Sequence, residues 1–75
     1  MIDNTFKLSK QIRQEIGREL WRARQEKHLY IYQVTKRTKI PIDLIDVMEL
    51  GKATDINALQ KLLKFYGKKM RIVFE

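Results

Sequence analysis

The chain has 75 residues, with 16 Lys and Arg, 9 Asp and Glu and no cysteine. A chain of this length predicts one domain near the lower limit for an independently stable hydrophobic core. The absence of cysteine excludes disulfides and thiolate metal sites, and no apolar run approaches the roughly 18 residues of a membrane span. We therefore expect a cytoplasmic protein without a membrane span, and its net charge of +7 favours a polyanionic partner or anionic lipid. Of these two we expect no membrane partner.

The N-terminal part of the chain predicts a polar arm over residues 1–8 and then a long amphipathic helix that ends near Lys27. Ser9 is a suitable N-cap, because its hydroxyl can accept a hydrogen bond from a free N–H of the first turn. His28 lies where a left-handed residue would end this helix. Trp21 lies about 100° around the helix from Leu20, outside the apolar stripe. The stripe has helical spacing and consists of Ile12, Ile16, Leu20 and Ala23.

Two short helices are predicted next, over about 31–37 and 41–50. Pro41 disfavours helical backbone in Ile40 and is well tolerated in a first helical turn, so it separates the two helices. Gly51 ends the second helix. A short amphipathic helix cannot bury its apolar stripe alone, so this pair needs the flanking helices as a scaffold. The pattern favours a helix-turn-helix module, an arrangement that usually reads nucleic acid.

The C-terminal part predicts a fourth helix and then a change of period. Asp55 is a suitable N-cap for the helix, and Gly67 is placed to end it. Beyond this glycine, Met70, Ile72 and Phe74 recur at every second position, which is the spacing of a strand. A single strand in a helical chain leaves backbone groups unpaired. We therefore expect it to pair with the same strand of a second copy across a two-fold axis.

The expected fold is mainly α, with four to five helices and a C-terminal β-strand that pairs across a homodimer. The polar arm occupies residues 1–8, and the helix-turn-helix domain occupies residues 9–67. The dimerisation strand occupies residues 68–75, and its apolar side chains are those of Met70, Ile72 and Phe74.

Four segments between residues 16 and 67 resemble the phage-repressor type of helix-turn-helix, the Cro and lambda-repressor superfamily. They read IGRELWRARQEKHL, VTKRTKI, IDVMELGK and LQKLLKFYG. The resemblance implies a structural ion pair between Arg24 and Glu49. The fourth helix followed by a strand-like end resembles the HipB-type antitoxins, which dimerise through such a strand, repress their own operon and bind a kinase toxin.

The resemblance implies a sequence-specific, DNA-binding transcriptional repressor, an antitoxin-like autoregulator of its own operon. Its implied partners are double-stranded DNA, a second copy of the chain and a toxin protein. The dimer would place two third helices in successive major grooves about one helical turn apart. Contacts to phosphates are then expected from the basic residues that flank the third helix, Lys36, Arg37, Lys39 and Lys52. Contacts to base edges would fall to Ile42, Asp43 and Asp46.

The third helix departs from that family in its exposed residues. Residues 41–50 contain Asp43, Asp46 and Glu49 and neither Lys nor Arg. Carboxylates are unfavourable beside phosphates, although an aspartate can accept a hydrogen bond from cytosine N4. At the start of the second helix, where the family has a Ser or Thr cap and then Gln, this chain has Tyr30 and Ile31.

A second resemblance supports an alternative function. The run from Thr38 to Pro41, followed by Leu44 and Glu49, resembles the helix-turn-helix of RodZ-type proteins, which contacts a protein filament instead of DNA. The alternative is therefore a protein-interaction module whose third helix no longer reads DNA. A basic face on the third helix would favour the repressor, whereas an apolar or acidic face would favour the protein-interaction module.

The remaining chemically distinctive residues have a structural interpretation beside each functional one. A single histidine at a helix end, His28, is typical of a cap instead of a ligand. The carboxylates of the third helix lack an accompanying nucleophile, phosphate-binding loop or metal-ligand spacing, so we expect no enzyme, no cofactor and no metal site. For three aromatic residues the sequence does not decide between base stacking, core packing and contact with a partner: Trp21, Tyr30 and Tyr32.

Overall fold

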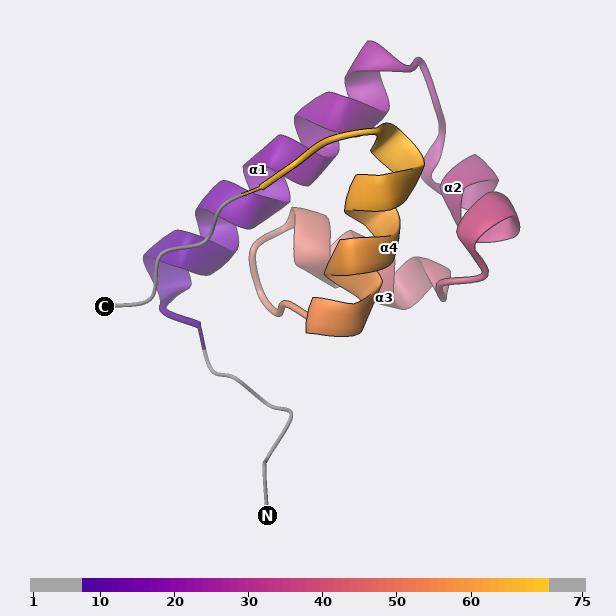
Figure 1. Cartoon of the computed structure of the whole chain (residues 1–75). Coiled ribbons are helices and arrows are strands. Elements are labelled where there is room, and N and C mark those ends of the chain that lie inside the picture. Colours follow the sequence, from indigo (N-terminus) through magenta and orange to yellow (C-terminus); the bar gives the residue numbers. More distant parts are fainter. Residues whose placement is uncertain (1–7, 71–75) are drawn as a thin grey trace.

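The computed structural model describes residues 8–70, which form four helices joined by short connections (Figure 1). The helices are α1 (Lys10–Glu26), α2 (Ile31–Thr38), α3 (Ile42–Glu49) and α4 (Ile56–Tyr66). α3 packs against both α1 and α2, and α4 packs against the same two helices. The long α1 and the short α2 thus hold α3 and α4 between them, and the prediction of a mainly helical chain is confirmed.

The predicted capping residues end or begin the helices as expected. The Ser9 hydroxyl accepts a hydrogen bond from the Ile12 N–H at 3.2 Å, and the Asp55 carboxylate accepts one from the Ala58 N–H at 2.9 Å. Each such cap stabilises a helix by about 1 kcal/mol. His28 adopts the left-handed conformation after α1, with φ of 55°, and Gly67 does the same after α4, with φ of 68°.

α2 ends at Thr38, one residue beyond the predicted 31–37, and the residue that follows, Lys39, is left-handed, with φ of 65°. The Lys39 N–H donates to the Thr35 carbonyl at 2.8 Å, and the Thr38 hydroxyl donates to the Val34 carbonyl at 2.7 Å. The connection between α2 and α3 is therefore the three-residue turn 39–41. Nothing in the residue type predicts this, because a left-handed lysine is held by its surroundings and not by its own preference.

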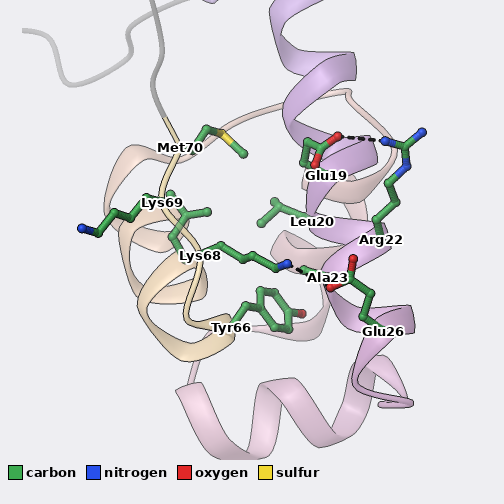
Figure 2. Close-up of a pocket in the computed structure, with 10 residues that line it drawn as sticks. Glu19, Leu20, Arg22, Ala23, Glu26, Tyr66, Lys68, Lys69 and Met70 are labelled. Atoms are coloured by element: carbon green, nitrogen blue, oxygen red, sulfur yellow. Dashed lines mark hydrogen bonds and ion pairs between the residues drawn. The ribbon is translucent and has the colours of Figure 1, made fainter.

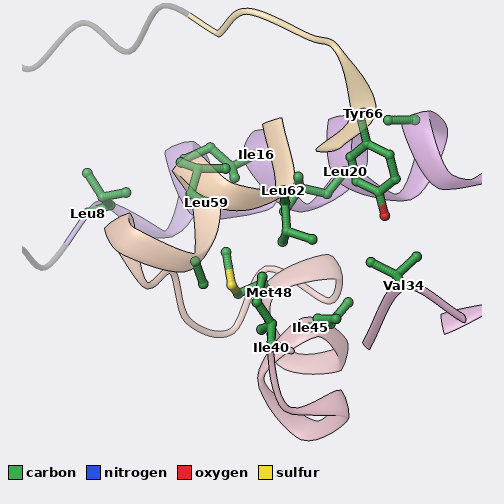
Figure 3. Packing of buried hydrophobic residues seen from close by; sticks show 12 residues of the cluster. Leu8, Ile16, Leu20, Val34, Ile40, Ile45, Met48, Leu59, Leu62 and Tyr66 are labelled. Atoms are coloured by element: carbon green, nitrogen blue, oxygen red, sulfur yellow. The ribbon is translucent and has the colours of Figure 1, made fainter. Parts of the chain in front are cut away.

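The hydrophobic core lies where the four helices meet (Figure 3). α3 contributes Ile45 and Met48, which have no exposed surface. Trp21 is absent from this core and keeps 49% of its surface exposed, as its position outside the α1 stripe predicts. The buried side chains are those of Leu8, Ile16, Leu20, Ala23, Val34, Ile40, Ile45, Met48, Ala58, Leu59, Leu62 and Tyr66.

The backbones of α1 and α3 touch at Gly17. A Cβ atom at this position would lie 2.5 Å from the Met48 carbonyl oxygen and 2.6 Å from that of Glu49. Both distances are far below a normal contact, so only a residue without a Cβ allows the two helices to cross this closely. The crossing brings the end of α3 against the middle of α1.

The predicted C-terminal strand pair across a homodimer is wrong. Residues 8–70 contain no strand, and Met70 packs against the core of its own chain instead of lying in a sheet. After Gly67 the Lys68 N–H donates to the Leu63 carbonyl at 2.9 Å, which turns the chain back along α1. An apolar residue in this segment thus finds burial within one chain, and its spacing does not require a partner strand. Ile72 and Phe74 lie outside the described residues.

Candidate functional site

The outer side of α3 carries apolar and acidic side chains. Its inner side is occupied by core residues, which leaves Ile42, Asp43 and Asp46 exposed, and Ile42 keeps 41% of its surface. Leu50, the residue that follows the helix, is 57% exposed. Asp43 lies in the first turn, where a carboxylate is favourable to the helix dipole. Residues 41–50 contain no Lys or Arg, so no cation of α3 offsets these carboxylates.

An open surface hollow lies beside this outer side, between α1 and the end of α3. Its walls are Gln14, Arg18 and Trp21 from α1 and Glu49 and Leu50 from the end of α3. Trp21 and Leu50 are both about half exposed, so two large apolar side chains border this hollow. Sequence patterns identify Trp21 as an outward residue but give no reason to place Leu50 beside it. That pairing depends on how closely α1 and α3 cross.

The Arg24–Glu49 ion pair implied by the resemblance is present and fixes this crossing. The Arg24 Nε and Nη2 atoms donate to the two Glu49 carboxylate oxygens, each at 2.8 Å. A third bond runs from Arg24 Nη1 to the Leu29 carbonyl at 3.0 Å, which ties the loop after α1 to the same point. The side chains are only 14% and 7% exposed. Hydrogen bonding to Glu49 raises the pKa of Arg24 above its ordinary value.

Tyr66 of α4 lies close to this ion pair. Burial, together with the nearby Glu49 carboxylate, raises the pKa of Tyr66 to about 12. The Tyr66 hydroxyl is buried and has no hydrogen-bond partner among the described residues. A buried hydroxyl without a partner costs stability, so this tyrosine contributes through its ring and not through its oxygen.

The basic residues predicted to contact phosphates are all exposed. Lys36 and Arg37 lie on α2, Lys39 lies in the turn before α3, and Lys52 follows Gly51 after α3. They therefore flank α3 along the chain, and none of them belongs to its outer side. The structure brings the three residues predicted to contact bases together on the exposed side of α3, namely Ile42, Asp43 and Asp46.

Two exposed tyrosines stack on each other where α2 begins. The Tyr30 and Tyr32 ring centroids are 5.9 Å apart, and the ring planes differ by 8°. Tyr30 is 68% exposed and Tyr32 is 59% exposed, so neither ring belongs to the core. The Gln33 side chain accepts a hydrogen bond from the Tyr30 N–H at 2.7 Å, which holds the backbone of this turn.

A second concavity lies between α1 and the segment that follows α4 (Figure 2). The Lys68 ammonium bridges it to Glu26 at 2.9 Å, and Met70 lies at its other end. Lys68 and Glu26 are both about half exposed, so their ion pair contributes little to stability. The two carboxylates that line it are both engaged in ion pairs, Glu26 with Lys68 and Glu19 with Arg22 at 3.1 Å.

Comparison with known proteins gives no relative: no family model, no curated protein and no solved structure matches the chain. Within residues 8–70, no group of three or more His, Cys, Asp or Glu side chains could hold a metal ion. None of the four described helices combines the length and the apolar character that a membrane crossing requires.

Proposed function

We propose that this chain is a helix-turn-helix domain that binds a protein partner through α3. The binding surface, called the α3 face below, consists of Trp21, Ile42, Asp43, Asp46 and Leu50. The observation that carries the proposal is the composition of this surface, which is apolar and acidic where a DNA reader would be polar and basic. Positions 43, 46 and 50 lie three and four residues apart, so their side chains follow one line along the helix.

The apolar members of the α3 face supply the driving force for binding. Tryptophan is enriched among the residues that dominate protein interfaces, and its side chain offers a large, stiff contact area. Covering the exposed half of Trp21 removes on the order of 100 Å² from water, worth about 2–3 kcal/mol. Ile42 and Leu50 add smaller amounts of the same kind. These contributions give affinity only to a partner that fills the hollow with an apolar side chain.

The acidic members define which partner fits. Asp43 and Asp46 are exposed and have no ion-pair partner among residues 8–70. A segment that carries Lys or Arg next to a large apolar residue complements both features of the face. The same carboxylates repel the phosphates of a duplex, so electrostatics favour a basic polypeptide over DNA at this surface.

Synthetic helical peptides test the proposal directly. One set carries Lys or Arg beside Leu or Phe, and a matched set replaces each cation with Glu. Trp21 is the only tryptophan of the chain, so its emission reports on coverage of the α3 face. We expect the basic set to shift Trp21 emission to shorter wavelength and the acidic set to leave it unchanged. The proposal fails if neither set changes the emission.

Two variants locate the binding surface. Replacing both Asp43 and Asp46 by Asn should weaken the binding of basic peptides. The fold should stay intact, because both side chains are exposed. Gln60→Ala, on the exposed side of α4, is the matched control and should change nothing. Equal binding by the Asn variant and the parent protein would place the peptide elsewhere.

Duplex DNA binding is the second candidate function, as an antitoxin-like autoregulatory repressor. The observation that favours it is the exposure of Lys36, Arg37, Lys39 and Lys52 at both ends of α3. A mobility shift on the DNA upstream of the gene, at about 50 and 200 mM salt, measures this activity. If a lysine contacts a phosphate, its replacement by Ala should reduce the salt slope by about one unit. Salt-independent behaviour, or no shift at the lower salt, rules this candidate out.

A further inference from the structure

The exposed side of α2 differs sharply from the α3 face, because it combines aromatic and basic side chains. Tyr32 and Lys36 lie four residues apart on α2, so they share one side of the helix, and Lys39 is exposed in the turn that follows. At a rise of 1.5 Å per residue, the line from Tyr32 to Lys36 spans about 6 Å of the helix. Tyr30 stacks on Tyr32 at one end of it. We call these four residues the α2 ridge.

The segment of the chain that carries the α2 ridge has no carboxylate that could neutralise its lysines. Residues 27–42 contain no Asp or Glu, and they contain a further exposed cation, Arg37, beside Lys36. The two tyrosines stabilise each other by stacking, by about 0.5–1.5 kcal/mol in typical aromatic pairs. That interaction does not account for their exposure, since each ring still offers more than half of its surface to solvent.

Aromatic rings beside a line of cations are the features with which proteins hold single-stranded nucleic acid. Bases of a single strand have free faces that stack on aromatic side chains, whereas the bases of a duplex are already stacked on each other. The Tyr30 and Tyr32 rings are already in contact, with centroids 5.9 Å apart, so a base stacks on the outer face of the pair and not between the rings. Lys36, about one helical turn beyond Tyr32, and Lys39, in the turn after the helix, are the exposed cations that the adjoining phosphates would contact.

We propose that the α2 ridge is a binding site for single-stranded RNA or DNA. The site is separate from the α3 face and does not depend on the function proposed for it. A domain with both surfaces would hold a single strand on one helix and a basic polypeptide on the next.

Binding of labelled oligonucleotides, followed by fluorescence anisotropy, tests the ridge. The probes are a single-stranded oligothymidine, an abasic strand with the same number of phosphates, and a duplex of equal length. Stacking predicts that the oligothymidine binds about tenfold more tightly than the abasic strand. The double variant with Tyr30→Leu and Tyr32→Leu should bind both strands equally and keep the salt slope of the parent protein. Equal affinity of the parent protein for oligothymidine and abasic strand would overturn the proposal.

Further variants separate the ridge from general electrostatic attraction. Lys36→Ala should reduce the salt slope for the single strand by about 0.7, whereas Lys61→Ala on α4 should leave it unchanged. Asp43→Asn, in the α3 face, should not weaken the binding of the oligothymidine. Circular dichroism confirms that each variant is folded. If Lys36→Ala and Lys61→Ala have equal effects, or if the duplex binds more tightly than the single strand, the ridge is not a single-strand site.

Discussion

The variant Gly17→Ala tests the contact on which the α3 face depends. The added Cβ would lie 2.5 Å from the Met48 carbonyl oxygen, about 1 Å closer than an ordinary van der Waals contact, which begins at 3.4 Å. The neighbouring Glu49 carbonyl, at 2.6 Å, blocks the same space. Both obstacles are backbone atoms, so the clash is relieved only if α1 and α3 move apart.

The expected magnitude is the difference between two effects. Overpacking a close contact costs about 1–3 kcal/mol or more, and the backbone obstacles place this site at the upper end. Alanine offsets part of this cost, because in a helix interior it is about 1 kcal/mol more favourable than glycine. The net loss in the free energy of unfolding should be about 2 kcal/mol. In a domain of this size that lowers the melting temperature by about 8–16 °C.

Urea unfolding followed by circular dichroism measures the change, and Trp21 emission reports on the adjacent hollow. Gly67→Ala is the companion variant, because it has no atom within 4 Å of the new Cβ but has a φ of +68°. It should cost about 1 kcal/mol through backbone conformation alone and leave Trp21 emission unchanged. A Gly17→Ala protein as stable as the parent protein would refute the claimed contact between the two backbones.

Two further predictions concern the polar groups beneath the α3 face. Removing either Arg24 or Glu49 should cost about 3–5 kcal/mol, because the remaining charge is buried without a partner, and a double-mutant cycle that gives negligible coupling would contradict this. Tyr66→Phe should leave stability at pH 7 equal or higher, since the lost hydroxyl has no partner among the described residues. In the parent protein the raised pKa means that the fold favours the neutral phenol of Tyr66. The contribution of this group to the free energy of unfolding is therefore fully present below pH 10 and is lost as the pH rises from 10.0 toward about 12. Urea unfolding at pH 8, 10 and 11 should show a smaller decline for Tyr66→Phe, and equal declines would show that Tyr66 is not responsible.

The helices could be predicted from the sequence because their signals are local. Ser9 and Asp55 act as caps through neighbours three residues away, and the α1 stripe is a matter of spacing within one helix. The prediction of a C-terminal strand was wrong because it depended on a contact that is not local. Alternating apolar residues indicate that one side is covered but not by what, and Met70 is covered by its own chain.

The candidate site was only partly predictable, because its shape depends on contacts between distant segments. The exposure of Ile42 and Asp43 follows from helical periodicity. The hollow between Trp21 and Leu50 requires Gly17 to bring α1 against the end of α3, and no pattern within either helix records that crossing. The left-handed Lys39 is a similar case, since the surrounding fold and not the residue type sets its conformation.

The net charge of +7 is a poor guide to the partner, because charges of opposite sign are separated along the chain. Residues 27–42 contain no carboxylate, and residues 41–50 contain no cation, so the sign changes at the turn between α2 and α3. At physiological salt, charges are screened beyond about 8 Å, and a ligand therefore responds mainly to the helix that it approaches. We therefore expect a polyanion to favour α2 and a basic segment to favour α3. Added salt should weaken both kinds of binding, so the effect of Asp43→Asn on each ligand, and not the salt dependence, separates the two surfaces.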